Sequence, residues 1–186
     1  LSQGKYWITS LDAFVQPLLK CFETVYLSAA YTHLNDRHVT FEKYLRTKQF
    51  DLSAYTSFTP TITFVLREDR FWYRFVFLEW LFLASAKFNV AKIFKPLFLF
   101  HQQRLVKKTV RHITRQVSNC NFFVVGLGST GRYPATITDL RADITSVETE
   151  KIWNAAYAKS HVVIGVHGSN MLIPTSLAAG FIDILP

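Results

Sequence analysis

A turn near the C-terminal end of the sequence combines a side chain that can transfer a proton with residues that suit an anion. It consists of His167, Gly168, Ser169 and Asn170. The run before it, 161–166, has the composition of a buried strand, and Pro174 fits only the first turn of a helix, which is therefore predicted to begin close by. Helix N-termini attract anions, and histidine exchanges protons near neutral pH. Alternatively, Gly168 and Asn170 serve only the turn, and His167 is a satisfied buried histidine.

Two arginines follow another predicted strand. The β-branched run Thr61–Leu66 alternates as a strand does. The residues that come after it are Arg67, Glu68, Asp69 and Arg70. Arginine suits bidentate contacts with phosphate. If this strand and 161–166 belong to one parallel sheet, their carboxyl ends face the same crevice. The alternative is surface pairing of the arginines with the neighbouring carboxylates.

A glycine-rich segment lies between these two motifs. The spacing of Gly126, Gly128 and Gly131 matches the G-x-G-x-x-G pattern of dinucleotide-binding loops. That pattern needs a helix to begin inside it, so that helix N–H groups meet the pyrophosphate. Here Pro134 and β-branched residues follow, which disfavours a helix. The segment is therefore predicted as a turn beside a ligand crevice, with Gly126, Gly128 and Ser129 as candidate residues, or as a plain loop.

The C-terminal part of the chain alternates between strand and helix patterns. Predicted strands cover 121–125, 161–166 and 181–185. A capping box, Thr145–Glu148, starts a helix that runs to about Lys159 and is predicted to bury Ile152, Ala155 and Ala156. A second helix follows the turn at 167–170. This alternation predicts an α/β fold with a Rossmann-like parallel sheet over residues 59–186.

The middle of the chain is basic and aromatic. Residues 67–115 hold 11 Lys/Arg against 3 Asp/Glu, and residues 71–100 hold 8 of the 17 phenylalanines. Charged residues interrupt this run, so it lacks the uncharged length of a transmembrane helix. It fits a helical pair packed in a core, or an interfacial segment that docks on a membrane. His101–Asn119 is predicted as one helix, which completes a helical insertion over about 71–119.

Length and composition limit the remaining classes. The 186 residues start at Leu1 and stop after an apolar run, so we expect a piece of a longer protein, with 1–58 as a helical N-terminal segment. Cys21 and Cys120 are too few for a disulfide framework and lack the clustered ligands of a zinc site, so no metal site is predicted. The basic region lacks known nucleic-acid-binding patterns, which argues against a nucleic-acid partner.

The two strand-end motifs together resemble the family 61 glycosyltransferases. The resemblance rests on Thr63–Arg67 with Arg70 behind it, on the His-Gly turn in Gly165–Ser169, and on the closing segment Ala179–Pro186. It covers about residues 60–186. It implies a GT-B architecture, in which a nucleotide-sugar donor binds between two Rossmann-like domains. It also implies inversion at the anomeric carbon, with neither a metal nor a cofactor beyond the donor.

The same resemblance implies roles for individual residues. Arg67, Arg70 and Gly168–Asn170 would bind the donor diphosphate, while His167, or less favourably Asp69, would be the catalytic base. The acceptor would be a glycan or a lipid-linked acceptor of polysaccharide biosynthesis. Independently of the resemblance, the basic and aromatic composition of 71–119 predicts that this segment holds a cytoplasmic enzyme near an anionic membrane surface. The fragment is not expected to be active alone.

Two alternatives stay open at this stage. The first is an NAD(P)-type dinucleotide-binding domain built on the glycine-rich segment. The second is a non-catalytic module that binds a membrane or a partner chain. That second alternative gains weight if Arg67 and His167 lie far apart in the fold.

Overall fold

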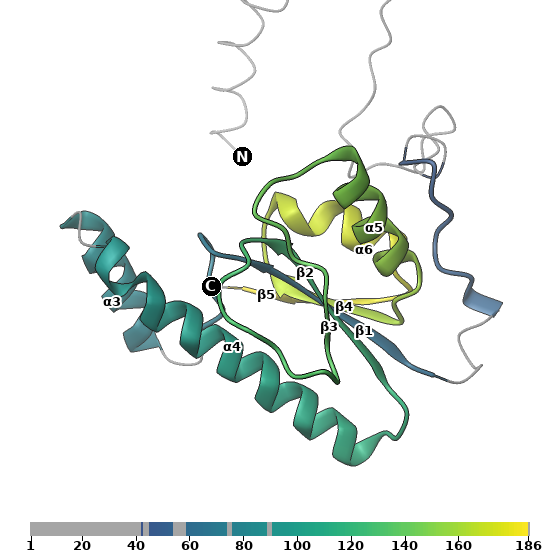
Figure 1. Ribbon diagram of the computed structural model, residues 1–186, viewed down its shortest axis with the longest axis horizontal. Helices are drawn as coiled ribbons and strands as arrows, with labels where there is room; N and C mark the ends of the chain where they lie inside the picture. Colours follow the sequence, from purple (N-terminus) through teal and green to yellow (C-terminus); the bar gives the residue numbers. More distant parts are fainter. Residues whose placement is uncertain (1–41, 43–44, 54–58, 74–75, 89–90, 186) are drawn as a thin grey trace, which may run out of the picture. The chain divides into compact units, whose positions relative to one another are not determined.

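The computed structural model describes residues 42, 45–53, 59–73, 76–88 and 91–185, all of which belong to one compact unit (Figure 1). Most of the predicted N-terminal helical segment, 1–58, lies outside these residues. The predicted domain over 59–186 can therefore be followed through nearly all of its length, with short gaps only.

The described residues form a five-stranded, all-parallel sheet in the order β3-β2-β1-β4-β5. The strands are β1 Thr61–Arg67, β2 Asn121–Leu127, β3 Thr138–Asp139, β4 Val162–Val166 and β5 Phe181–Ile184. The chain moves outward from β1 through β2 to β3 and then returns to β4 on the other side of β1. Adjacent strands whose connections leave in opposite directions create a crevice at their carboxyl ends. The predicted α/β fold with a parallel sheet is confirmed, its strand order is consistent with a Rossmann-like core, and the switch point lies between β1 and β4.

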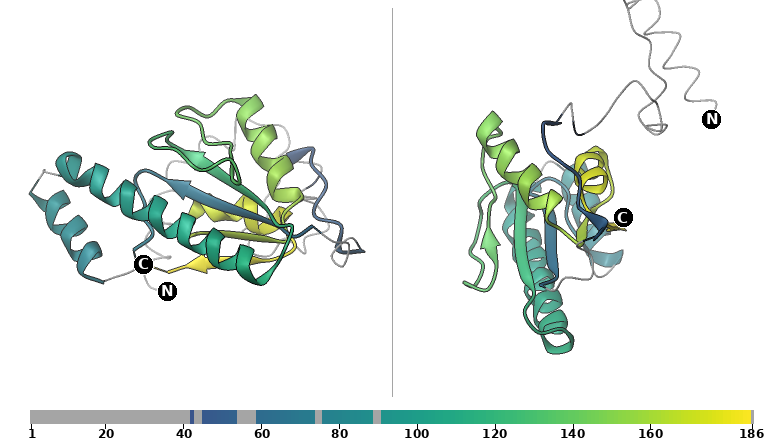
Figure 2. Two further views of the ribbon diagram at one scale, coloured as in Figure 1. Left: turned by 60° about the horizontal axis from the view of Figure 1, so that its bottom comes forward. Right: turned by 90° about the vertical axis from the view of Figure 1, so that its right-hand side faces the viewer.

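Helices cover both faces of the sheet. They are α3 Val76–Lys87, α4 Ala91–Gln116, α5 Val147–Ala158, the 3₁₀ turn η3 Ser169–Met171 and α6 Leu172–Leu177. Helices α3 and α4 connect β1 to β2, α5 connects β3 to β4, and α6 connects β4 to β5. In Figures 1 and 2, α4 runs along one side of the strands, whereas α5 and α6 lie together on the other.

Alternate residues of the central strands build two separate cores. Phe64 and Leu66 of β1 pack with Val106 and Val110 of α4. Val65, between them in sequence, packs on the opposite face with residues of α5 and α6. This two-residue period follows from the pleat of a strand, which points successive side chains to opposite faces. β1 is buried on both sides for that reason, as central parallel strands are.

The structure corrects several predicted boundaries. Helix α4 begins at Ala91 and includes Pro96, so it is ten residues longer at its start than the helix predicted from His101. The N-cap of α5 is Ser146, whose side chain accepts a hydrogen bond from Thr149 N at 3.1 Å, one residue later than the predicted capping box. Helix α5 buries Trp153, Asn154, Ala156 and Tyr157, whereas Ile152 and Ala155, which were predicted as buried, are exposed.

None of the described helices is long and apolar enough to span a membrane.

Candidate functional site

The structure brings the two predicted groups of site residues together at the switch point. β1 and β4 are hydrogen-bonded neighbours, so Arg67 at the end of β1 and the turn after β4 share one edge of the sheet. Nη1 of Arg70 donates a hydrogen bond to the carbonyl oxygen of His167 at 3.1 Å, although the two residues are 97 positions apart. Arg67 and the His167 turn are therefore close together. A large separation between them would have favoured the non-catalytic binding module.

Gly168 makes this approach of Arg70 possible. Its φ of 151° is in a region that side chains rarely adopt. A Cβ added at Gly168 would overlap with Nη1 of Arg70 and would lie 3.0 Å from Oδ1 of Asn170. Any larger residue would therefore push the guanidinium away from the turn. The Oδ1 of Asn170 is buried and has no hydrogen-bond partner among the described residues.

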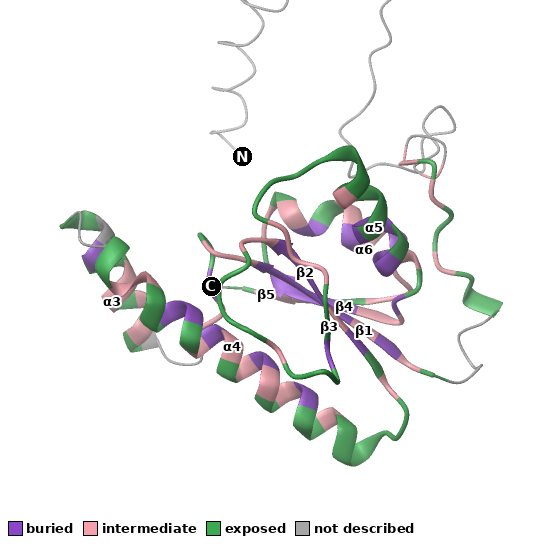
Figure 3. Cartoon of the chain, viewed as in Figure 1, coloured by how far each residue is buried: buried purple, intermediate pink, exposed green. Residues whose placement is uncertain are grey.

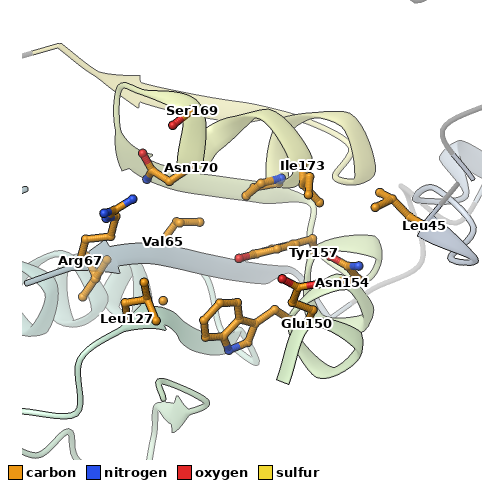
Figure 4. Close-up of a pocket in the computed structure, with 14 residues that line it drawn as sticks. Leu45, Val65, Arg67, Leu127, Glu150, Asn154, Tyr157, Ser169, Asn170 and Ile173 are labelled. Carbon is orange, nitrogen blue, oxygen red and sulfur yellow. The ribbon is translucent and has the colours of Figure 1, made fainter. Parts of the chain in front are cut away.

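A cavity of about 220 Å³ opens beside this edge, on the face of the sheet that α5 and α6 cover (Figure 4). Arg67, Ser169 and Asn170 gather at one end of it, and Leu45 lies at the other. Most of the wall between them is apolar, including Trp153 of α5. The site thus combines a polar, cationic end with an apolar interior, as small-molecule sites commonly do.

Asp69 holds the guanidinium of Arg67 in a bidentate ion pair. Nε of Arg67 lies 2.7 Å from Oδ1, and Nη2 lies 2.5 Å from Oδ2. Hydrogen bonds from Arg67 are the largest cause of a lowered pKa at Asp69. A carboxylate with a lowered pKa is a weaker proton acceptor, which disfavours Asp69 as a catalytic base. Surface pairing, the predicted alternative for the arginines, therefore applies to Arg67.

Arg70 differs from Arg67 in its partners. Within the described residues, no carboxylate lies within ion-pairing distance of Arg70, and Glu68 pairs instead with Lys95 at 2.9 Å. Gln102 of α4, which is 3% exposed, donates to the carbonyl oxygen of Arg67 at 3.3 Å and accepts from Trp72 N at 2.9 Å. The segment that carries both arginines is thereby tied to α4.

A histidine–aspartate pair completes the edge. Nδ1 of His167 lies 2.5 Å from Oδ2 of Asp183 in β5. An ionised carboxylate only accepts hydrogen bonds, so the proton of neutral His167 is on Nδ1. Nε2 is then unprotonated, and the side chain is 60% exposed, so Nε2 can take a proton from a bound molecule. The sequence prediction missed Asp183; the signal was a single charged residue inside the apolar run Phe181–Leu185.

The glycine-rich segment lacks the helix that the dinucleotide-binding motif requires. No helix begins within it, and the chain continues as a loop past Pro134. The backbone N–H of Ser129 donates to Asp143 at 3.0 Å, and that of Thr130 donates to Glu68 at 2.9 Å. Carboxylates therefore occupy the N–H groups that a pyrophosphate would need. Of the predicted crevice residues, Gly126 lines the cavity, whereas Gly128 and Ser129 do not.

Among the described residues, no three His, Cys, Asp or Glu side chains are placed to hold a metal ion. The fold and the site define a parallel α/β domain with two arginines and a cavity at its switch point. Comparisons with protein-family models, with curated proteins and with solved structures find no match to this chain. The resemblance to family 61 glycosyltransferases thus stays a prediction, and function has to be argued from the residues of the site.

Proposed function

We propose that this domain binds the nucleotide-sugar donor of an inverting glycosyltransferase. The observation that carries the proposal is the contact between Arg70 and the His167 carbonyl, which joins two strand ends beside a cavity at the switch point. Open α/β sheets bind ligands at such points, and arginines there favour an anionic group such as a diphosphate. The Arg67, Asp69 and Arg70 side chains together carry a net charge of +1.

The apolar wall of the cavity supports the same class of ligand. A nucleotide sugar carries a flat base and a sugar ring on either side of its diphosphate. Trp153 and Tyr157 on α5 offer flat, apolar surface within the cavity, while Arg67 is at its polar end. An inorganic phosphate would contact only the polar end of the cavity and leave its apolar wall unoccupied.

The proposed reaction places each group in a defined role. The acceptor hydroxyl attacks the anomeric carbon, and the bond from that carbon to the diphosphate oxygen breaks. The electron pair leaves with the nucleoside diphosphate, whose charge Arg67 and Arg70 stabilise. Nε2 of His167 accepts the proton of the attacking hydroxyl. Asp183 then stabilises the imidazolium, in the way that a carboxylate supports a histidine base in other enzymes.

A thermal-shift titration tests donor binding directly. The protein is titrated with UDP, GDP, CDP and NAD, because a ligand that binds the folded state raises the melting temperature with concentration. We expect a rise with one of the diphosphates, and a loss of that rise in Arg70→Ala. Arg104→Ala, an exposed arginine on α4, is the matched control and should respond as the wild type does.

Two results would overturn the proposal. One is the absence of a shift with any nucleoside diphosphate. The other is a shift that is the same in wild type, Arg70→Ala and Arg104→Ala, because the ligand would then bind elsewhere. His167→Ala is expected to keep most of the diphosphate shift, since its proposed role concerns the acceptor proton.

A further inference from the structure

Helices α3 and α4 expose an unusually large set of apolar side chains. On and just after α3 these are Phe77, Trp80, Leu83 and Phe88, which are 72%, 71%, 58% and 72% exposed. On the first half of α4 they are Ile93, Leu97 and Phe100, which are 74%, 47% and 64% exposed. We name these seven residues the aromatic face. Figure 3 shows exposed residues along both helices. Exposed apolar patches of this kind mark interaction surfaces.

The aromatic face is not needed to pack the two helices together. Their inner sides form a cluster of their own, in which Phe71, Phe98 and Leu99 are buried. The rings of Phe82 and Phe98 meet edge to face with centroids 5.3 Å apart. The residues of the aromatic face lie outside this cluster, so among the described residues they take no part in packing α3 against α4.

On α4 the same side of the helix changes from apolar to basic. Arg104, Lys108, Arg111 and Arg115 follow Phe100 at spacings of three and four residues, and all four are exposed. Such spacings keep side chains on one side of a helix. We name these four residues the basic face. Between residues 76 and 116 the sequence has eight Lys/Arg and only one acidic residue, Glu79.

We infer that the aromatic and basic faces dock this protein on an anionic lipid bilayer. Phenylalanine and tryptophan side chains enter the boundary between headgroups and acyl chains, and arginine and lysine attract anionic headgroups. The excess of eight Lys/Arg over the single Glu79 along these helices complements a surface of many anionic headgroups, and this charge complementarity commits the surface to lipid. The inference does not depend on the proposed transferase activity.

Docking through α4 would also set the distance between the bilayer and the cavity. The buried Gln102 bonds the carbonyl of Arg67, so the helix that carries the two faces is tied to the strand end that carries the site. An acceptor held in the membrane would be presented at a fixed position relative to Arg67. The two faces and the cavity therefore belong to the same compact unit of the described chain.

Vesicle co-sedimentation of the 186-residue chain tests the inference. Vesicles of pure phosphatidylcholine are compared with vesicles that contain 30% phosphatidylglycerol, at low and at high salt. We expect at least tenfold tighter binding to the anionic vesicles and a loss of that preference at high salt. Trp80→Ser with Phe100→Ser, and separately Arg104→Gln with Lys108→Gln and Arg111→Gln, should each weaken binding at least tenfold.

The control replaces exposed residues of α5 on the other side of the sheet. Lys151→Gln with Ile152→Ser should bind within twofold of the wild type. Equal binding to neutral and anionic vesicles, or equal binding by all variants, would overturn the inference. Self-association in light scattering that the Trp80 and Phe100 substitutions abolish, without vesicle binding, would identify a second copy as the occupant and also overturn it. The melting temperature of each variant without ligand identifies a folding defect. The thermal shift of each variant with nucleotide shows whether the donor site is intact, independently of membrane docking.

Discussion

Replacing Gly168 by alanine tests whether Arg70 and the turn after β4 form one unit. With φ of 151° and ψ of −179°, Gly168 has a conformation nearly restricted to glycine, and other residues forced into it cost about 1–3 kcal/mol. The new Cβ would also overlap with Nη1 of Arg70. Because that atom ends a flexible side chain, Arg70 can swing away, but its hydrogen bond to His167 is then lost. Such a bond contributes about 1 kcal/mol.

Together these effects predict that Gly168→Ala lowers the free energy of unfolding by roughly 2–4 kcal/mol. Urea unfolding followed by circular dichroism measures this as a lower midpoint at an unchanged slope. Gly180→Ala is the matched control, because a Cβ there lies 3.5 Å from the nearest atom, His161 O, and the backbone is not left-handed. The control should stay within about 1 kcal/mol of the wild type.

The Arg70→Ala background separates the two contributions. In that background the overlap is gone and only the backbone strain remains, so Gly168→Ala should be less destabilising by about 1 kcal/mol. If Gly168→Ala is as stable as Gly180→Ala, the turn does not hold the described conformation. If the loss is the same with and without Arg70, the contact between Arg70 and the turn contributes nothing to stability.

Three further substitutions test other parts of the structure. Burial raises the pKa of Tyr133 from 10.0 to about 12. Between these pH values the tyrosine of the unfolded state loses its proton first, so the free energy of unfolding falls as pH rises. Tyr133→Phe should remove that part of the fall, measured by urea unfolding. Nitrogen NMR at pH 8 should find the proton of His167 on Nδ1, and Asp183→Ala should produce a mixture of tautomers; an unchanged spectrum contradicts the pairing. Phe98→Ala should cost about 3–5 kcal/mol, whereas the exposed Phe100→Ala should cost less than about 0.5 kcal/mol; equal losses would contradict the assigned faces of α4.

Local patterns predicted the long elements well and the short or ambiguous ones poorly. The β-branched run at Thr61–Leu66 is recognisable without any partner, and it forms β1. β3 has only two exposed residues and exists because Thr138 pairs with Phe123 of β2, so nothing within it indicates a strand. The start of α4 was predicted too late because the aromatic run before it is apolar on both sides of the helix and hides the helical period.

The buried face of α5 depended on its partner in the same way. Ile152 and Trp153 are neighbours in sequence, and both are apolar. Trp153 packs in the apolar cluster against the sheet, and its indole Nε1 donates to the carbonyl oxygen of Leu140 at 2.7 Å, whereas Ile152 faces solvent. Successive residues of a helix point in directions about 100° apart, so two adjacent apolar residues do not show which side of the helix is buried; packing decides it.

The sequence by itself determined the separate parts of the candidate site. The sequence shows Arg67 and Arg70 after one predicted strand, and His167 and Gly168 after another. These motifs can be recognised because strand composition and turn-forming residues are properties of a few consecutive residues. Only the tertiary structure decided how the parts meet, because contacts between distant residues depend on the order of the strands. Placing β1 beside β4 joins Arg70 to His167 across 97 residues, and placing β5 beside β4 brings Asp183 to His167. Gly168 is required for two reasons that only the structure shows: its φ of 151° disfavours any side chain, and a guanidinium from another element lies where its Cβ would be.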